Sequence, residues 1–115
     1  MIDLELKELN SFYGTANYYS VLGVNITDGV KYLMDNGYSW FINDFLVCTK
    51  TVKELQNEEF LSVILKVDLD NKKAVMDITD GNNHILYSQK YDYTDAKRNL
   101  KLFFTDNVLL LAQEY

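Results

Sequence analysis

The residues that most often carry catalysis or bind metals are scarce in this sequence. Cys48 is the only cysteine and His84 the only histidine, and they stand far apart along the chain. A zinc site needs three or four nitrogen and sulfur ligands, and a thiol nucleophile needs a histidine close by as its base. The five glycines are isolated from one another, so no glycine-rich phosphate loop can be built from them. We therefore expect neither a zinc site nor a cysteine nucleophile.

Paired carboxylates are the remaining enzymatic option. Asp77 with Asp80, or Asp92 with Asp95, could hold a divalent cation or act as acid and base. The run 68–71 resembles the start of a calcium loop, but it lacks the glycine and the terminal glutamate of that loop. A Thr-Asp pair begins at each of Thr27, Thr79, Thr94 and Thr105. Capping and turn chemistry explains these pairs best. We expect no catalytic residue, no cofactor and no metal, and therefore no enzyme.

Tyrosine is the enriched residue type, with nine copies in 115 residues. Protein-binding surfaces favour tyrosine because its ring offers a large contact area at a small entropy cost. One cluster of tyrosines lies in the irregular connection near the N-terminus, and another lies beside carboxylates at the third predicted strand. Together they predict a surface that recognises a basic partner. The predicted partner-binding residues are Tyr18, Tyr19, Tyr91, Asp92, Tyr93 and Asp95. The alternative is that these rings complete a small core and its edges.

Length and charge restrict the class of protein. A chain of 115 residues predicts a single domain over 1–115. The formal net charge of -6 opposes generic binding to nucleic acid and to anionic membranes. One cysteine indicates a reducing compartment, and acids within residues 1–8 do not fit a signal peptide. We expect a soluble protein of the cytoplasm.

Hydrophobic periodicity predicts two halves. Apolar residues at helical spacing predict helices over about 2–12, 28–36 and 38–50, with a stop at Asn36 and Gly37. Period-two alternation and the turns between apolar segments predict strands over about 60–69, 73–79, 84–91, 98–104 and 108–111. The segment from Tyr18 to Val24 is expected to be an extended loop or a brief strand. Short connections favour an antiparallel meander, so we predict an α+β fold with the helices packed on one face of that sheet.

Several segments together resemble a known family. They are Thr27 to Leu33 (TDGVKYL), Tyr38 to Asp44 (YSWFIND), Tyr93 to Asp95 (YTD) and Asn107 to Leu111 (NVLLL). In this combination the chain resembles an uncharacterised family, a domain of unknown function found in short bacterial, phage and plasmid proteins. The resemblance implies a context rather than an activity, because such genes often interfere with host defence. It implies no catalytic residue.

Three functions from different classes follow from these observations. The first is a non-catalytic inhibitor that covers the basic nucleic-acid surface of a CRISPR effector or another defence nuclease, as an anti-CRISPR protein would. The second is a small-ligand or nucleotide-binding protein, or a hydrolase, whose site lies between helices and sheet near Tyr32 and Trp40. The third is a structural homodimer formed through an exposed edge strand such as 108–111.

Overall fold

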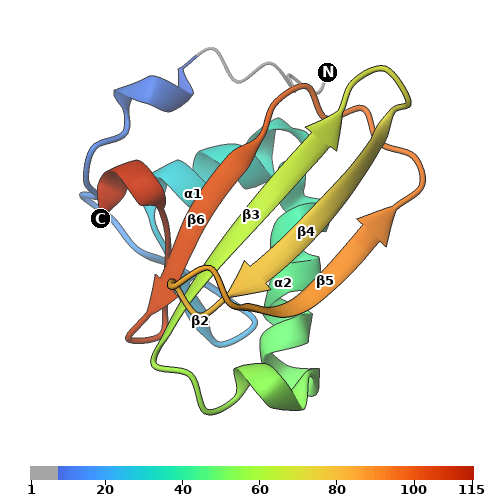
Figure 1. Ribbon diagram of the computed structural model, residues 1–115. Helices are drawn as coiled ribbons and strands as arrows, with labels where there is room; N and C mark the ends of the chain where they lie inside the picture. The colour runs from blue at the N-terminus through green and yellow to red at the C-terminus, as the bar shows by residue number, and fades with distance from the viewer. Residues whose placement is uncertain (1–7) are drawn as a thin grey trace.

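Strands from both ends of the chain join in one sheet. The structure is a computed structural model that describes residues 8–115. Its sheet has the order β1-β2-β7-β6-β3-β4-β5 (Figure 1). The strands are β1 (Tyr19–Val21), β2 (Val24–Ile26), β3 (Phe60–Asp68), β4 (Lys73–Thr79), β5 (Ile85–Tyr91), β6 (Leu100–Thr105) and β7 (Val108–Leu111). All five predicted strands are present, and the α+β class is confirmed.

The predicted meander is wrong after its third strand. β3, β4 and β5 follow one another as antiparallel neighbours, but β6 pairs with β3 rather than with β5. The resulting spatial order is that of a Greek key. Residues 92–99 connect β5 to β6. An extended segment of that length can reach about 26 Å, more than the roughly 14 Å across three strand spacings. Alternation along a strand does not reveal which neighbour the strand takes.

The last strand is not an edge, contrary to the prediction for 108–111. β7 lies between β6, with which it is antiparallel, and β2, with which it is parallel. The segment predicted as an extended loop or brief strand forms the β1–β2 hairpin, which turns at Leu22 and Gly23 with φ of 51° and 82°. Within the described residues the edges are therefore β1 and β5. A dimer built through an exposed 108–111 edge is not possible in this fold.

The helices follow β2 directly. α1 (Asp28–Leu33) continues through a π-helical turn, η2 (Met34–Tyr38), into α2 (Ser39–Thr51). The predicted break is confirmed, because Asn36 is non-helical and Gly37 has a φ of 101°. Residues 2–7 of the predicted first helix lie outside the described part of the chain. Short 3-10 helices occupy Leu9–Ser11 (η1), Lys53–Leu55 (η3) and Ala112–Glu114 (η4).

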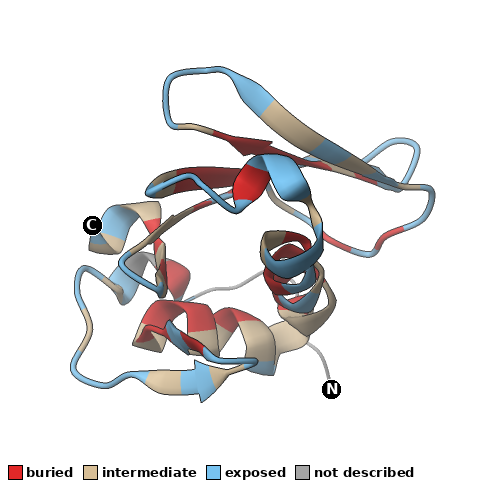
Figure 2. Ribbon diagram, turned by 90° about the horizontal axis from the view of Figure 1, so that it is seen from below, coloured by how far each residue is buried: buried red, intermediate tan, exposed pale blue. Residues whose placement is uncertain are grey.

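The core lies between the helices and one face of the sheet. Figure 1 shows α1 and α2 behind the sheet, and Figure 2 shows buried residues on the surfaces that face each other. Alternate residues of the central strands point to this side, as period-two geometry requires. The fully buried residues of α2 and the strands include Phe41, Ile42, Phe45, Leu46, Leu65, Met76, Ile78, Leu102 and Leu109. We call the opposite side of the sheet the outer face.

A buried carboxylate sits on the outer face. Asp77 is only 7% exposed. It accepts a hydrogen bond of 2.6 Å from Ser88 Oγ and forms an ion pair of 3.0 Å with Lys66 Nζ. Burial alone would raise the pKa of Asp77, but these two partners outweigh it and hold the pKa below its ordinary value of 3.8. The ionised form is therefore bound more favourably in the folded state than in the unfolded chain.

The Asp77 network predicts acid sensitivity. A lowered folded-state pKa adds stability above the unfolded value, and this contribution is lost as pH falls through the folded value. Asp77→Asn should therefore be less stable than wild type at pH 7, and the difference in free energy of unfolding should shrink below about pH 4. Urea denaturation from pH 7 to pH 2.5 measures this difference. A gap that stays constant over the whole range would contradict the assignment.

The C-terminal helix η4 is bound to the start of α1. Glu114 accepts hydrogen bonds from Thr27 Oγ1 (2.6 Å) and from the backbone N–H groups of Gly29 (3.2 Å) and Leu111 (2.9 Å). Thr27 in turn caps α1 by accepting from Val30 N–H at 3.4 Å. A Cβ at position 29 would collide with the Leu111 side chain, so glycine allows this close approach.

Glu114→Ala should destabilise the fold. The substitution leaves a hydroxyl and two N–H groups without their acceptor, and hydrogen bonds to a charged group contribute about 1.5–3 kcal/mol. We expect the free energy of unfolding to fall by about 2 kcal/mol in urea denaturation. Glu58→Ala, at an exposed position, is the matched control and should leave it within about 0.5 kcal/mol of wild type. Equal losses in the two variants would argue against a stabilising role of the hydrogen bonds to Glu114.

Candidate functional site

The connection between β5 and β6 is held in place at three points. The backbone N–H of Thr94 donates to the Lys72 carbonyl at 2.7 Å, which ties the connection to the β3–β4 turn. The backbone N–H of Lys97 donates to the Tyr38 hydroxyl at 3.4 Å, and Asn99 Oδ1 accepts from Val67 N–H at 2.7 Å. These contacts give residues 92–99 a defined conformation although they form no regular secondary structure.

Anchoring of Thr94 turns its neighbours outward. Thr94 is 6% exposed, and its Oγ1 accepts from Ala96 N–H at 3.1 Å. Tyr93 is 66% exposed, and its hydroxyl donates to Asp95 Oδ1 at 3.0 Å. This hydrogen bond, with the negative charge of Asp95, raises the pKa of the Tyr93 phenol. Asp92 is also exposed. Of the predicted residues, Tyr93 and Asp95 are therefore in contact, and Asp92 is exposed next to Tyr93 in the chain.

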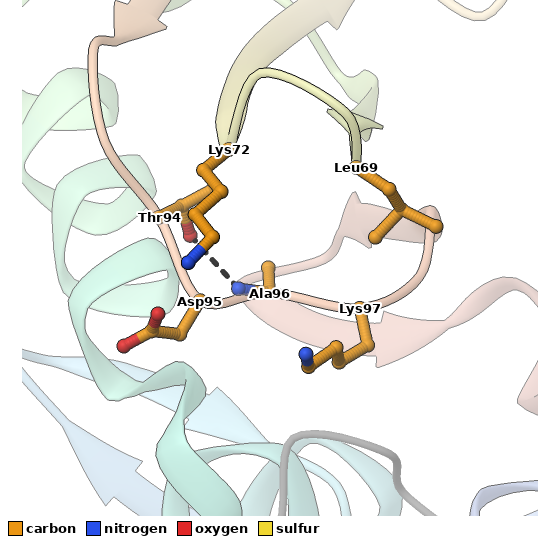
Figure 3. Close-up of a pocket in the computed structure, with 6 residues that line it drawn as sticks. All are labelled: Leu69, Lys72, Thr94, Asp95, Ala96 and Lys97. Carbon is orange, nitrogen blue, oxygen red and sulfur yellow. Dashed lines mark hydrogen bonds between the residues drawn. The ribbon is translucent and has the colours of Figure 1, made fainter.

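A small hollow lies beside the hydrogen-bonded pair of Tyr93 and Asp95. Its volume is about 60 Å³, and it is lined by Leu69, Lys72, Thr94, Asp95, Ala96 and Lys97. Figure 3 shows Leu69 and Lys72 of the β3–β4 turn on one side and residues 94–97 on the other. Small-molecule sites usually measure roughly 300–1,000 Å³. The hollow can therefore take the tip of a side chain but is too small for a metabolite. We call Leu69, Tyr93 and Asp95 the crossover patch.

Tyr91 belongs to the interior side of the sheet. Its hydroxyl donates to Asp44 Oδ2 at 2.8 Å, and its ring packs edge-on against Trp40 with 4.9 Å between centroids. Burial and the bond to Asp44 raise the pKa of Tyr91 far above its ordinary value. β5 ends at Tyr91. The alternation that would put this residue on the same side as Tyr93 therefore does not continue into the connection.

Tyr18 and Tyr19 lie elsewhere. Tyr18 is 61% exposed, whereas Tyr19 is half-buried on β1 and donates from its hydroxyl to Asp28 Oδ1 at 3.3 Å. β1 and β5 are opposite edges in the order of the sheet. Tyr19 lines an open groove of about 530 Å³ between β1 and the helices, together with residues such as Lys31 and Met34. The predicted tyrosine surface thus divides into two separate parts.

The other candidate groups of the sequence serve packing or stand apart. Trp40 contacts the rings of Tyr38, Phe41 and Tyr91, and the Tyr32 ring packs on Phe12. The Cys48 thiol is buried on α2, which raises its pKa. His84 Nδ1 lies 3.7 Å from Asp80 in the exposed β4–β5 connection. Across residues 8–115, no group of three or more His, Cys, Asp or Glu side chains could hold a metal ion.

Sequence reasoning missed the anchors of the site. Leu69 and Lys72 come from a turn more than twenty positions before Tyr93, so no local pattern links them. Thr94 does carry a local signal, because a Thr-Asp pair indicates turn chemistry. Its hydroxyl accepts a hydrogen bond from the N–H two residues further along the chain. That signal locates the turn but not its partner strand.

Fold and site together define a small α+β protein with a Greek-key sheet, one helical layer and an exposed patch of a phenol, a carboxylate and an aliphatic side chain. The chain belongs to a family of unknown function, DUF6876, whose model matches residues 3–115. The predicted membership of an uncharacterised family is thereby confirmed. A comparison with curated proteins found no match, and a comparison with solved structures found none. No helix in residues 8–115 is long and apolar enough to cross a membrane.

The two tyrosines of this region should respond differently to loss of their hydroxyls. Tyr91→Phe leaves the half-buried Asp44 without its shortest hydrogen bond, so we expect the free energy of unfolding to fall by about 1–2 kcal/mol. Tyr93→Phe removes an exposed bond and should change it by less than about 0.5 kcal/mol. Urea denaturation monitored by tryptophan fluorescence compares the two variants. Equal effects would contradict a stabilising role of the hydrogen bond from Tyr91 to Asp44.

Proposed function

We propose that this protein is a non-catalytic protein-binding module that contacts its partner through the crossover patch. The observation that carries the proposal is the exposure of large side chains on an anchored segment and on the turn that holds it, with Tyr93 at 66% and Leu69 at 59%. A segment that is already ordered loses little conformational entropy on binding. An exposed aromatic ring beside a hollow for a side-chain tip is the kind of feature that dominates binding energies between proteins.

The chemistry of the patch favours a basic partner. Asp95 and the neighbouring Asp92 present carboxylates that can accept bonds from arginine or lysine, and the Tyr93 ring can contact the cation. The net charge of -6 adds long-range attraction toward a basic surface. Basic surfaces of this kind commonly hold nucleic acid, so binding there would compete with nucleic acid.

The resemblance to short phage and plasmid proteins extends this proposal to a biological role. A protein of a mobile element that covers a basic nucleic-acid surface would inhibit a bacterial defence nuclease, for example a CRISPR effector. Such an anti-CRISPR-like inhibitor would act in the cytoplasm of the host cell and would need no cofactor. Acidity, small size and the exposed tyrosine support this role.

A small-ligand function is the second candidate. The groove of about 530 Å³ between β1 and the helices falls in the size range of small-molecule sites. Its rim carries the ion pair of Lys31 with Asp35 at 2.7 Å. A nucleotide absorbance that remains with the purified protein would favour this function over protein binding.

The crossover patch can be tested by affinity capture. Tagged wild-type protein, Tyr93→Ala and Asp95→Lys are incubated with nuclease-treated bacterial lysate, and retained proteins are quantified by mass spectrometry. We expect wild type to retain one nucleic-acid-binding protein in near-equal amount and both variants to retain at least tenfold less, a loss of about 1.4 kcal/mol or more. The matched control is Glu58→Lys, which makes the same charge change as Asp95→Lys outside the patch. Retention unchanged in both variants would contradict the proposal.

A further inference from the structure

The outer face carries an aromatic cluster. The rings of Phe60 on β3 and Phe103 on β6 lie 5.1 Å apart between centroids, and Tyr115 packs on both at 5.8 and 5.3 Å. Tyr115 is 72% exposed. These three rings form an apolar surface on the outer face; in Figure 1 the sheet lies in front of α1 and α2, so this face is turned toward the viewer.

Aliphatic side chains extend this surface across the sheet. Ile64 on β3 and Val75 on β4 are only half-buried. By alternation they point to the same side as Asp77 and Ser88, which is the side away from the helices. The solvated face of an antiparallel sheet normally carries polar residues. Half-buried aliphatic residues at these central positions therefore require an explanation beyond the fold.

Lysines flank the aliphatic residues. Val75 has Lys66 directly opposite on β3 and Lys90 directly opposite on β5. Ile64 has Lys101 opposite on β6. Lys101 Nζ also lies 5.5 Å from the centroid of an aromatic ring of the cluster, that of Phe103. Lysine stems add apolar area while their ammonium groups stay in water.

The lysines give the outer face a positive charge that the whole chain does not have. Among the cross-strand pairs that contain these lysines and aliphatic residues, the carboxylate is that of Asp77. It already forms an ion pair with Lys66 at 3.0 Å. Asp68 and Lys73 form the next cross-strand pair and balance each other. Lys90 and Lys101 are left as an excess of positive charge beside exposed apolar surface, in a protein with a net charge of -6.

We propose that the outer face is a second docking surface, which takes an acidic and apolar segment of a protein partner. Apolar side chains of the segment would cover the aromatic cluster and the central aliphatic residues, and its carboxylates would meet Lys90 and Lys101. A second copy of this chain is the wrong occupant, because a symmetric contact through this face would oppose lysines to lysines. The surface is formed by other residues than the crossover patch, and the proposal does not depend on the function of that patch.

Single-stranded nucleic acid is the competing occupant, because aromatic rings with lysines also fit bases and phosphates. The acidic protein segment is favoured for two reasons. The half-buried aliphatic residues Ile64 and Val75 offer no aromatic ring on which a base can stack, whereas apolar side chains of a protein segment can cover them. Lys90 and Lys101 stand on β5 and β6, with β4 and β3 between them, so they do not form a continuous basic track for successive phosphates.

The test uses a labelled peptide of defined chemistry. A 12-residue amphipathic peptide of leucine and glutamate is titrated with the full chain in fluorescence anisotropy, beside a leucine and lysine peptide and a 12-nucleotide oligo-dT. We expect saturable binding of the acidic peptide, at least tenfold tighter than of the other two probes. Absence of saturable binding, or tighter binding of either other probe, would overturn the proposal.

Charge reversal locates the binding surface. The double variant Lys90→Glu and Lys101→Glu should weaken binding of the acidic peptide at least tenfold, with a circular dichroism spectrum like that of wild type. Lys50→Glu with Lys53→Glu makes the same change at exposed positions near the end of α2 and should leave binding unchanged. Asp95→Lys should bind the acidic peptide at least as well as wild type, which separates this test from that of the crossover patch. Equal losses in the two double variants would contradict the assignment to the outer face.

Discussion

The parallel pairing of β2 with β7 is the constraint on which the rest of the structure depends. It places Asn25 opposite Val108 and Ile26 opposite Leu109, and so joins segments more than eighty residues apart. Backbone bonds extend it, since Thr27 N–H donates to the Leu109 carbonyl at 3.3 Å. Ile26 and Leu109 are fully buried. Because α1 begins two residues after β2, this pairing also positions the helical layer against the sheet.

The Greek-key return then decides where an exposed surface can form. β6 lies next to β7 because a two-residue turn joins them in a hairpin, and its other neighbour is β3. The connection from β5 must therefore run past the ends of β4 and β3. It passes the β3–β4 turn, where Thr94 bonds to Lys72. The exposed position of Tyr93 and Asp95 is thus a consequence of strand order, and the patch combines residues that the sequence keeps apart.

The two faces of the sheet differ in chemistry. One is covered by the helices and holds the large buried side chains, whereas the outer face mixes aromatic and aliphatic residues with lysines. A net charge of -6 describes the average of the molecule. The strands separate charges by alternation, because Lys66, Lys90 and Lys101 all point away from the core. Under the two proposals, an acidic partner and a basic partner would be recognised at different places on one small protein.

The sequence by itself determined the features that depend on neighbours along the chain. Alternation and turn residues placed β3 to β7 to within a few residues. Asn36 and Gly37 marked the helix break, and Asp92, Tyr93 and Asp95 stood out as a cluster. Only the tertiary structure decided that β7 is interior, that Tyr91 bonds to Asp44, and that Leu69 joins the patch. The physical reason is that strand pairing and burial are set by contacts between distant segments. Local periodicity reports that a residue needs a partner, but the partner itself is chosen by the packing of the whole chain.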